Sequence, residues 1–170
     1  MAKSSSSRAL AVQPTFAWMR QRLSRIIAFG FGSGLMKPAP GTWGTLAAWL
    51  LWQPISMIGS PIAIGVFLLA AFGVGVWACD RVGRELGSPD YGGMVWDEFV
   101  AFWAVLWLIP DTVMAQAFGF LLFRLFDILK PPPIAWFDRR FKNGLGVMWD
   151  DIVAMFYAVL VFSVFHWLFN

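Results

Sequence analysis

The sequence contains very little cysteine and histidine, with one residue of each in 170. The single cysteine, Cys79, cannot form an internal disulfide. Together with His166 it also supplies too few ligands for a zinc site, which takes several cysteine and histidine side chains. Residues 2–12 are rich in serine and lack the apolar core of a signal peptide, so we expect a disordered tail there.

Charged residues are scarce as well, at 14% of the chain compared with about 25% in a typical soluble domain. Hydrophobic residues make up 59% and aromatic residues 18%. This balance predicts a small integral membrane protein surrounded by membrane lipids. The formal net charge of +3 is too small to indicate a nucleic-acid partner. We expect a disordered basic arm over residues 1–25 and a single integral-membrane catalytic domain over residues 26–170.

The sequence contains several long apolar segments. Eighteen helical residues cover about 27 Å, close to the thickness of the hydrocarbon layer. The fold class that we predict is all-α, a polytopic membrane helix bundle. Residues 26–36 are too short and too rich in glycine to cross, so we expect them to be re-entrant or interfacial. The five predicted apolar segments are residues 42–58, 62–79, 99–109, 112–129 and 152–169.

The basic residues fall on alternate connections between these segments. The positive-inside rule places such connections in the cytoplasm. The N-terminus is then inside and the C-terminus outside, and a basic N-terminal arm could rest on anionic headgroups. The basic residues on this side are Arg20, Arg22, Arg25, Arg81, Arg84, Lys130, Arg139, Arg140 and Lys142.

Five carboxylates lie at the cytoplasmic ends of the apolar runs. A charge beside hydrocarbon costs roughly 3 kcal/mol, so such residues usually face protein or water and mark a function. Carboxylates gathered in one layer repel each other unless a cation neutralises them, and hard cations such as Mg²⁺ take oxygen ligands. The alternative is that these acids pair with Arg124, Arg139 and Arg140 or lie in headgroup water. The five candidate metal ligands are Asp97, Glu98, Asp127, Asp150 and Asp151.

Two basic residues share a stretch of the fourth apolar segment with one of these acids. Arg124 and Asp127 are three residues apart and lie on one helix face, with Lys130 one turn further on. An i, i+3 salt bridge is the simple interpretation. The functional interpretation is that Asp127 binds metal while Arg124 and Lys130 contact a phosphate.

A glycine-containing turn precedes the first apolar segment. In the sequence of residues 40–45, Pro-Gly-Thr-Trp-Gly-Thr, glycines let backbone N–H groups approach a ligand, and a helix N-terminus attracts anions. The alternative is a plain helix start with Thr42 as N-cap. Because the turn lies in the same layer as the acids, we predict a phosphate cradle formed by Gly41, Thr42, Gly44 and Thr45.

Several phosphatase chemistries are excluded by missing residues. A cysteine phosphatase needs an arginine six positions after its cysteine, and Glu85 occupies that position after Cys79. A histidine-nucleophile lipid phosphatase needs a second histidine beside His166. There is no Asp-x-Asp start, and no base for a serine triad. Attack by water with the help of a metal ion remains.

These motifs together resemble the phosphatidylglycerophosphatase A family of bacterial inner-membrane lipid phosphatases. The resemblance covers roughly residues 26–160. It implies Mg²⁺-dependent conversion of phosphatidylglycerophosphate to phosphatidylglycerol and inorganic phosphate, at a site facing the cytoplasm. The matching blocks, in the order of the family, are residues 30–34 (Gly-Phe-Gly-Ser-Gly) with 40–45, 95–100 (Val-Trp-Asp-Glu-Phe-Val), 123–131 (Phe-Arg-Leu-Phe-Asp-Ile-Leu-Lys-Pro), 136–139 (Trp-Phe-Asp-Arg) and 144–154.

The hypothesis is a catalytic site of Asp97, Glu98, Asp127 and Asp151, with Asp150 as a further Mg²⁺ ligand. Glu98 is our candidate for the residue that orients or deprotonates water. Phosphate contacts are assigned to Arg124, Lys130 and Arg139, together with the turn at residues 41–45. Two rival functions are a phosphoalcohol transferase, whose Asp-Gly signature we do not find, and a non-enzymatic transporter or scaffold with a buried ion-pair network.

Overall fold

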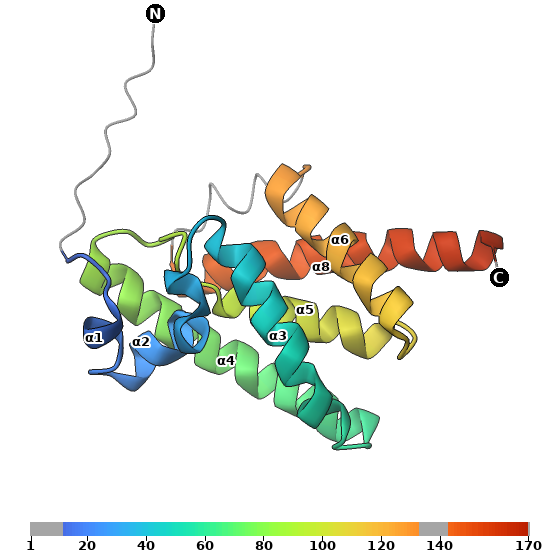
Figure 1. Ribbon diagram of the computed structural model, residues 1–170, viewed down its shortest axis with the longest axis horizontal. Coiled ribbons are helices and arrows are strands. Elements are labelled where there is room, and N and C mark those ends of the chain that lie inside the picture. The colour runs from blue at the N-terminus through green and yellow to red at the C-terminus, as the bar shows by residue number, and fades with distance from the viewer. Residues whose placement is uncertain (1–11, 133–142, 170) are drawn as a thin grey trace, which may run out of the picture.

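The computed structural model describes residues 12–132 and 143–169. In these two ranges every regular element is a helix (Figure 1), which confirms the predicted all-α class. The elements are α1 (Phe16–Met19), α2 (Leu23–Ala28), the 3-10 helix η1 (Gly30–Leu35), α3 (Pro40–Ser56), α4 (Pro61–Leu86), α5 (Trp96–Leu108), α6 (Val113–Leu129) and α8 (Gly144–Phe169).

Helix α5 is the centre of the bundle. Its first eleven residues, 96–106, are all buried, and it packs against α3, α4, α6 and α8. Two indole N–H groups tie it to its neighbours: Trp96 Nε1 donates to the Ala71 carbonyl of α4 at 3.0 Å, and Trp103 Nε1 donates to the Ala48 carbonyl of α3 at 2.8 Å. A buried indole N–H needs such an acceptor, so these bonds also fix the position of α5 along the bundle.

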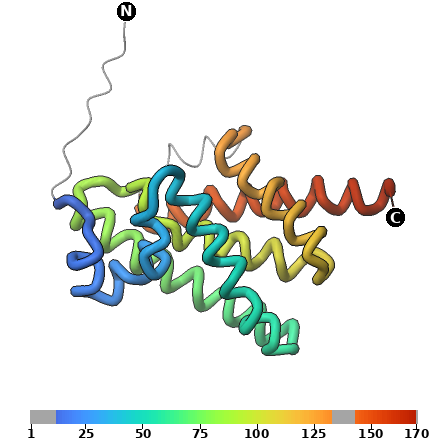
Figure 2. Tube along the Cα trace, viewed as in Figure 1, coloured from blue at the N-terminus to red at the C-terminus, as the bar shows by residue number. Residues whose placement is uncertain are grey.

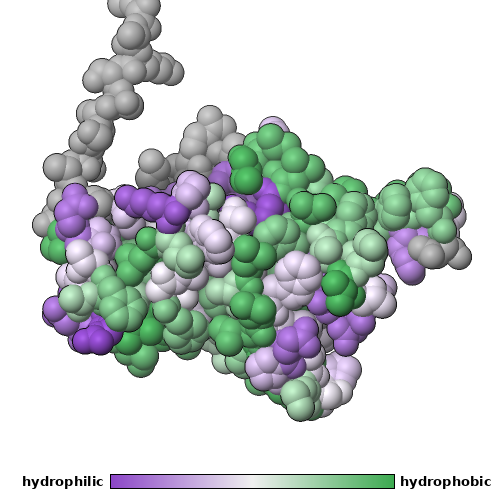
Figure 3. Space-filling model, in the orientation of Figure 1, coloured by the Kyte–Doolittle hydropathy of each residue, from purple (hydrophilic) through white to green (hydrophobic). Residues whose placement is uncertain are grey.

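Two helices of the described ranges, α4 and α8, are long and apolar enough to cross a membrane. Each has 26 residues, or about 39 Å of helix. The prediction of about five membrane-crossing segments is therefore not confirmed. Helices α3 and α6 have 17 residues each and α5 has 13. Because α5 is enclosed by other helices, its apolar sequence reflects burial in protein. Hydrophobic surface (green) covers much of α3 and α6 in Figure 3.

Residues 26–36, predicted to be too short to cross, contain a sharp reversal of the chain. Phe31 and Gly32 in η1 both have positive φ, at 57° and 108°. The segment braces the loop that leads into α5: the Val95 N–H donates to the Ala28 carbonyl at 2.8 Å, and a Cβ on Gly34 would overlap the Gly93 carbonyl oxygen. This motif therefore supports the start of α5.

The prediction of a disordered arm through residue 25 is wrong for residues 16–25, which include α1 and the start of α2. The physical reason is a partly buried ion pair with a distant residue. Arg25 is 8% exposed, and its Nε donates to Glu85 of α4 at 2.8 Å. The Cα trace in Figure 2 shows this N-terminal segment (blue) folded back beside the bundle.

Replacement of Gly75 by alanine tests how closely α4, α5 and α8 pack. A Cβ on Gly75 would lie 2.5 Å from Met148 Sδ and 2.6 Å from Trp96 Cδ1, whereas a Cβ on Gly73 of the same helix meets nothing within 4 Å. Overpacking of this kind costs about 1–3 kcal/mol. We expect Gly75→Ala to lower the thermal unfolding temperature in detergent and Gly73→Ala to leave it unchanged or raise it. Equal unfolding temperatures would contradict this packing.

Candidate functional site

Three buried carboxylates from two helices meet at one point. Asp97 and Glu98 belong to the first turn of α5, and Asp151 belongs to α8. One oxygen of each lies within 4.8 Å of the others, and all three residues are at most 9% exposed. More than fifty residues separate Asp97 and Glu98 from Asp151 in the sequence, so their meeting is a property of the α5–α8 contact.

The start of α5 is held in place by a hydrogen bond within its first turn and by a hydrogen bond to α4. The Asp97 carboxylate accepts a hydrogen bond from the Glu98 N–H at 3.0 Å, which fixes its direction in the first turn. Negative side chains there also interact favourably with the helix dipole. The Trp96 indole, bonded to α4, prevents the turn from rotating. The two acids therefore point to a fixed place in the bundle.

The start of α8 is fixed by capping and by a close contact with α4. The Asn143 side-chain oxygen accepts from the Gly146 N–H at 2.9 Å, as an N-cap residue does. The Gly144 N–H donates to Asp80 Oδ1 at 3.5 Å, and a Cβ on Gly144 would overlap the α4 backbone. Residues 143–146 thus begin the helix that carries Asp150 and Asp151.

Helix α6 contributes Arg124 and Asp127 to the same place. Arg124 Nη1 lies 2.5 Å from Asp127 Oδ2 and 3.6 Å from Glu98 Oε1. Asp127 is thereby linked through Arg124 to Glu98. The i, i+3 salt bridge, which was the simple interpretation of this spacing, is present, but it is one part of a larger cluster that joins α5, α6 and α8.

Lys130 and Asp150 form the adjoining ion pair. Lys130 Nζ lies 2.5 Å from Asp150 Oδ2. Lys130 is the C-cap residue of α6 with φ of 43°, so the end of this helix turns the lysine toward α8. The structure thus brings all five predicted acids to neighbouring positions, with Asp150 next to a cation and Asp97, Glu98 and Asp151 next to each other.

Among the described residues of this cluster, carboxylates outnumber basic side chains. Within the described ranges, five carboxylates are accompanied by Arg124 and Lys130. Glu98 Oε2 and Asp151 Oδ2 are buried and have no hydrogen-bond partner among these residues. A buried charged oxygen without a partner is costly, and carboxylates this close repel. The arrangement calls for a further positive charge.

The donor set fits a hard divalent cation. All three clustered ligands are carboxylate oxygens, the type that Mg²⁺ and Ca²⁺ prefer. Ligand oxygens at about 2.1 Å from Mg²⁺ lie up to about 4.2 Å apart, and those around Ca²⁺ up to about 5 Å. Oxygens within 4.8 Å of one another meet the limit for Ca²⁺, and their upper bound lies slightly beyond the limit for Mg²⁺. Asp97, Glu98 and Asp151 are therefore the residues that could hold such an ion, with Asp127 beside them.

The turn at residues 40–45 reaches the cluster through Gly41. Helix α3 begins at Pro40 with Ala39 as its N-cap, so Thr42 lies inside the first turn and is not the cap. A Cβ on Gly41 would overlap Glu98 Oε1 and lie 3.0 Å from Arg124 Nη2. The absence of a side chain there lets Glu98 and Arg124 approach the α3 backbone.

The other turn residues have different contacts. The Thr45 hydroxyl is fully buried, donates to the Gly41 carbonyl at 2.8 Å and lies 3.5 Å from Arg124 Nη1. Gly44 packs against the Val95 side chain, and a Cβ on Gly44 would lie only 2.7 Å from Val95 Cβ. Thr42 is half-buried, and its N–H donates to the Ala39 carbonyl. Thr45 thus orients Arg124, and Gly44 supports the approach to α5.

Some candidate residues lie elsewhere, and some positioning residues were missed from sequence. Arg139, predicted to contact phosphate, lies outside the described residues, as does the motif at 136–139. Asp80 and Asn143, which fix the start of α8, were not singled out. An asparagine before an apolar helical run is an N-cap signal and could have identified Asn143, whereas Asp80 acts across a contact that has no local signal.

Comparison with known proteins identifies relatives over most of the chain. The family model described as Phosphatidylglycerophosphatase A matches residues 26–166. The chain is 44% identical over 146 residues to "Phosphatidylglycerophosphatase A" of Haemophilus influenzae, covering 84% of this chain and 89% of the relative. It is 39% identical over 145 residues to the protein of that name from Escherichia coli, covering 84% of each.

A third relative carries a different name. The chain is 35% identical over 153 residues to a "Putative phosphatidylinositol-3-phosphatase" of Bacteroides thetaiotaomicron, covering 84% of this chain and 92% of the relative. No solved structure matches the chain. The family match over residues 26–166 and the two relatives at 39% and 44% identity show that this chain belongs to the phosphatidylglycerophosphatase A family.

Proposed function

We propose that this phosphatase removes the terminal phosphate of phosphatidylglycerophosphate, releasing phosphatidylglycerol and inorganic phosphate, with the help of Mg²⁺. Family membership supports the reaction. The observation that carries the rest is the group of buried, clustered carboxylate oxygens on Asp97, Glu98 and Asp151, which lies beside the Arg124 guanidinium. This combination provides ligands for a cation and a positive contact for a phosphate in one place.

The metal ligands that we propose are Asp97, Glu98 and Asp151, with Asp127 and Asp150 at the edge of the set. Asp150 is paired with Lys130 and Asp127 with Arg124, so these two acids hold cationic side chains in position. When bound, a divalent cation offsets charge on the phosphoryl oxygens and makes water more acidic. The chain's own contribution is to keep these carboxylates converged and buried.

Arg124 is the side chain that we assign to the phosphate. Its Nε is buried and has no hydrogen-bond acceptor among the described residues, although Nη1 contacts Asp127 and Glu98. A buried guanidinium N–H without an acceptor is costly, and a phosphate oxygen is a suitable partner. Gly41 leaves room beside this group, and Lys130 adds a second positive charge next to Asp150.

Glu98 is our candidate for the residue that orients water or takes its proton. Its Oε1 faces Arg124 at 3.6 Å, while Oε2 is buried with no hydrogen-bond partner in the described ranges. An acceptor of this kind next to the phosphate contact can hold a water molecule in line for attack. Phosphoryl transfer depends mainly on such positioning and on charge stabilisation, which this cluster supplies.

We place the enzyme in the bacterial inner membrane, with several helices crossing and the site facing the cytoplasm. Helices α4 and α8 are long and apolar enough to span. Helices α3 and α6, at 17 residues or about 25 Å each, pack against α5 and are shorter members of the bundle. The acid cluster lies near the ends of α5, α6 and α8 that also adjoin the basic residues. Lipid tails would remain in the bilayer while the headgroup reaches the cluster.

A related lipid phosphate is the alternative substrate. It is favoured by the relative whose name refers to phosphatidylinositol-3-phosphate. Phosphate release measured on a panel of phosphorylated lipids, each with Mg²⁺ and with a chelator, separates the two. Highest turnover on phosphatidylglycerophosphate, lost with the chelator, is the expected result. Preference for an inositol lipid would overturn the proposed substrate. Phosphate release that is unaffected by the chelator would overturn the proposed dependence on Mg²⁺.

Replacement of each central acid by its amide tests the cluster. Asp97→Asn, Asp127→Asn and Asp151→Asn keep the side-chain shape but remove negative charge, so we expect each to lower Mg²⁺-dependent phosphate release by about 100-fold or more. Asp111→Asn is the matched control, because Asp111 interacts with Gln116, away from the cluster. Thermal unfolding confirms that each variant is folded. Near-normal turnover of any of the three would remove that residue from the site.

Gly41→Ala tests the close approach of α3 to the site. The added methyl group would displace Glu98 and the Arg124 guanidinium, and a misplacement of about 1 Å costs on the order of 100-fold in rate. We expect kcat to fall while the protein stays folded. Gly92→Ala is the control, since a Cβ there meets nothing within 4 Å. Equal activity of both variants would show that Gly41 does not border the reacting groups.

A further inference from the structure

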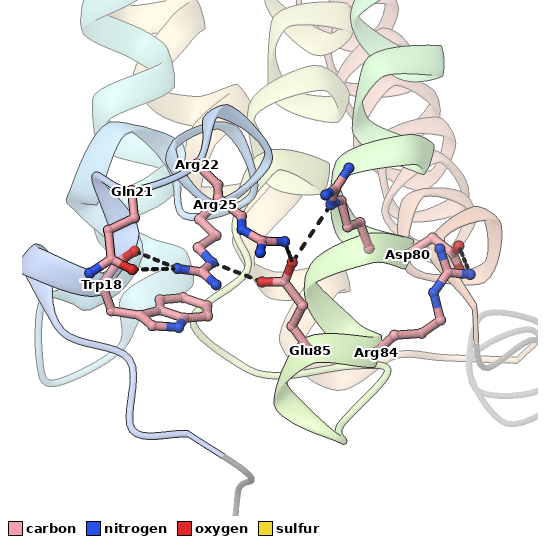
Figure 4. A network of polar contacts seen from close by, with 8 residues as sticks. Trp18, Gln21, Arg22, Arg25, Asp80, Arg84 and Glu85 are labelled. Carbon is pink, nitrogen blue, oxygen red and sulfur yellow. Dashed lines mark hydrogen bonds and ion pairs between the residues drawn. The ribbon is translucent and has the colours of Figure 1, made fainter.

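Three arginines converge on one carboxylate where α2 meets the C-terminal end of α4 (Figure 4). Arg22 Nη1 and Arg25 Nε lie 2.8 Å from the two oxygens of Glu85, and Arg81 Nε lies 3.6 Å from Oε1. One negative charge offsets only one of three positive charges. The cluster therefore carries a net positive charge at the surface of the protein.

Arg25 has a structural role in this cluster. It is buried, and its Nη1 donates to the Trp18 carbonyl at 2.9 Å and to Gln21 Oε1 at 3.2 Å. Its guanidinium also lies 4.0 Å from the centroid of the Trp18 ring, within cation–π range. Arg25 thus fastens α1 and α2 to α4 and accounts for the charge of Glu85 on its own.

Arg22 and Arg81 are in a different situation. Their side chains are 50% and 46% exposed. Both contact the same oxygen, Glu85 Oε1, at 2.8 and 3.6 Å, so the two contacting nitrogens lie no more than about 6.4 Å apart. In the described structure each uses one nitrogen on Glu85, and a guanidinium has five N–H donors. A guanidinium N–H donates to a phosphate oxygen at about 2.7–2.9 Å, so one phosphate can accept hydrogen bonds from both arginines across this separation.

Exposed apolar side chains lie on the two short helices of this region. Phe16 of α1 is 58% exposed, and Leu23 of α2, which follows Arg22 in the sequence, is 66% exposed. Figure 3 shows hydrophilic and hydrophobic surface side by side over α1 and α2, at the left edge. Short helices with exposed apolar residues next to arginines are typical of elements that lie in the membrane interface.

We propose that Arg22 and Arg81 bind the headgroup phosphate of an anionic phospholipid, while Phe16 and Leu23 enter the acyl boundary. The site docks α1 and α2 on the membrane surface. It is separate from the candidate active site, because its residues belong to α1, α2 and α4, whereas the phosphate contact proposed for catalysis is Arg124 of α6. It requires only that the chain lie at a membrane and does not depend on the reaction.

Native mass spectrometry of the full chain in detergent tests this site, because it measures how many lipid molecules remain bound to the protein. The probes are phosphatidylserine, which is neither the proposed substrate nor its product, and phosphatidylcholine, whose headgroup is neutral overall. We expect Arg22→Gln/Arg81→Gln to weaken phosphatidylserine binding by roughly 25-fold, from about a factor of five for each arginine near a lipid surface. Phosphatidylcholine binding should not change.

The matched control is Arg20→Gln/Arg84→Gln. It removes the same two charges from the same two parts of the chain, but neither residue contacts Glu85 in the described structure, and Arg84 pairs with Asp80. We expect the control to bind phosphatidylserine nearly as the unaltered chain does. Equal loss in both double variants would show that charge density alone attracts the lipid. No preference of the unaltered chain for phosphatidylserine would also overturn the site.

Stability and activity readouts keep the test independent of folding and of the proposed reaction. Arg25 remains on Glu85 in both double variants, so we expect their unfolding temperatures in neutral lipid to match. If the Arg22→Gln/Arg81→Gln variant fails to fold, the two single variants provide the same test, and we expect each to weaken phosphatidylserine binding by about fivefold. Phosphate release from detergent-solubilised substrate should be unchanged, and its loss alongside lipid binding would contradict the separation of the two sites.

Discussion

Mutual repulsion among buried carboxylates is the constraint on which this structure depends. Asp97, Glu98 and Asp151 bring oxygens within 4.8 Å of each other near one end of an apolar bundle, where all three are buried. Charges in such surroundings interact strongly because water does not screen them. Arg124 and Lys130 offset part of the repulsion through Asp127, Glu98 and Asp150. The remainder makes the packing of α5, α6 and α8 sensitive to any cation that binds, so binding and stability are linked.

The surrounding bundle is arranged to hold that cluster still. Residues 96–106 of α5 are buried, and the helix is fixed by indole hydrogen bonds from Trp96 and Trp103 to α4 and α3. Gly41 allows α3 to approach the Glu98 and Arg124 side chains. Such rigid support is what a phosphoryl-transfer site needs, because its catalysis depends mainly on placing charges before the substrate arrives.

Helix α4 connects the site with the N-terminal helices. Its last turns carry Glu85, which receives Arg22 and Arg25, and Asp80, which pairs with Arg84 and accepts the Gly144 N–H at the start of α8. One helix end thus holds both the segment that we propose to dock on anionic lipid and the segment that presents Asp150 and Asp151. A lipid headgroup contact and the acid cluster consequently share one structural support, although they lie on different helices.

The sequence by itself determined the all-helical class, the apolar character and the five acids at the ends of apolar runs. It also determined the Arg124–Asp127 pair, because residues three apart on a helix share a face whatever surrounds them. Only the tertiary structure decided that Asp97 and Glu98 meet Asp151, that Lys130 takes Asp150, and that Arg25 is buried against Glu85 sixty residues away. Helical periodicity acts within a few residues, whereas these contacts depend on how whole helices cross. For the same reason the apolar run of α5 suggested a membrane span, and only its neighbours showed that protein surrounds it.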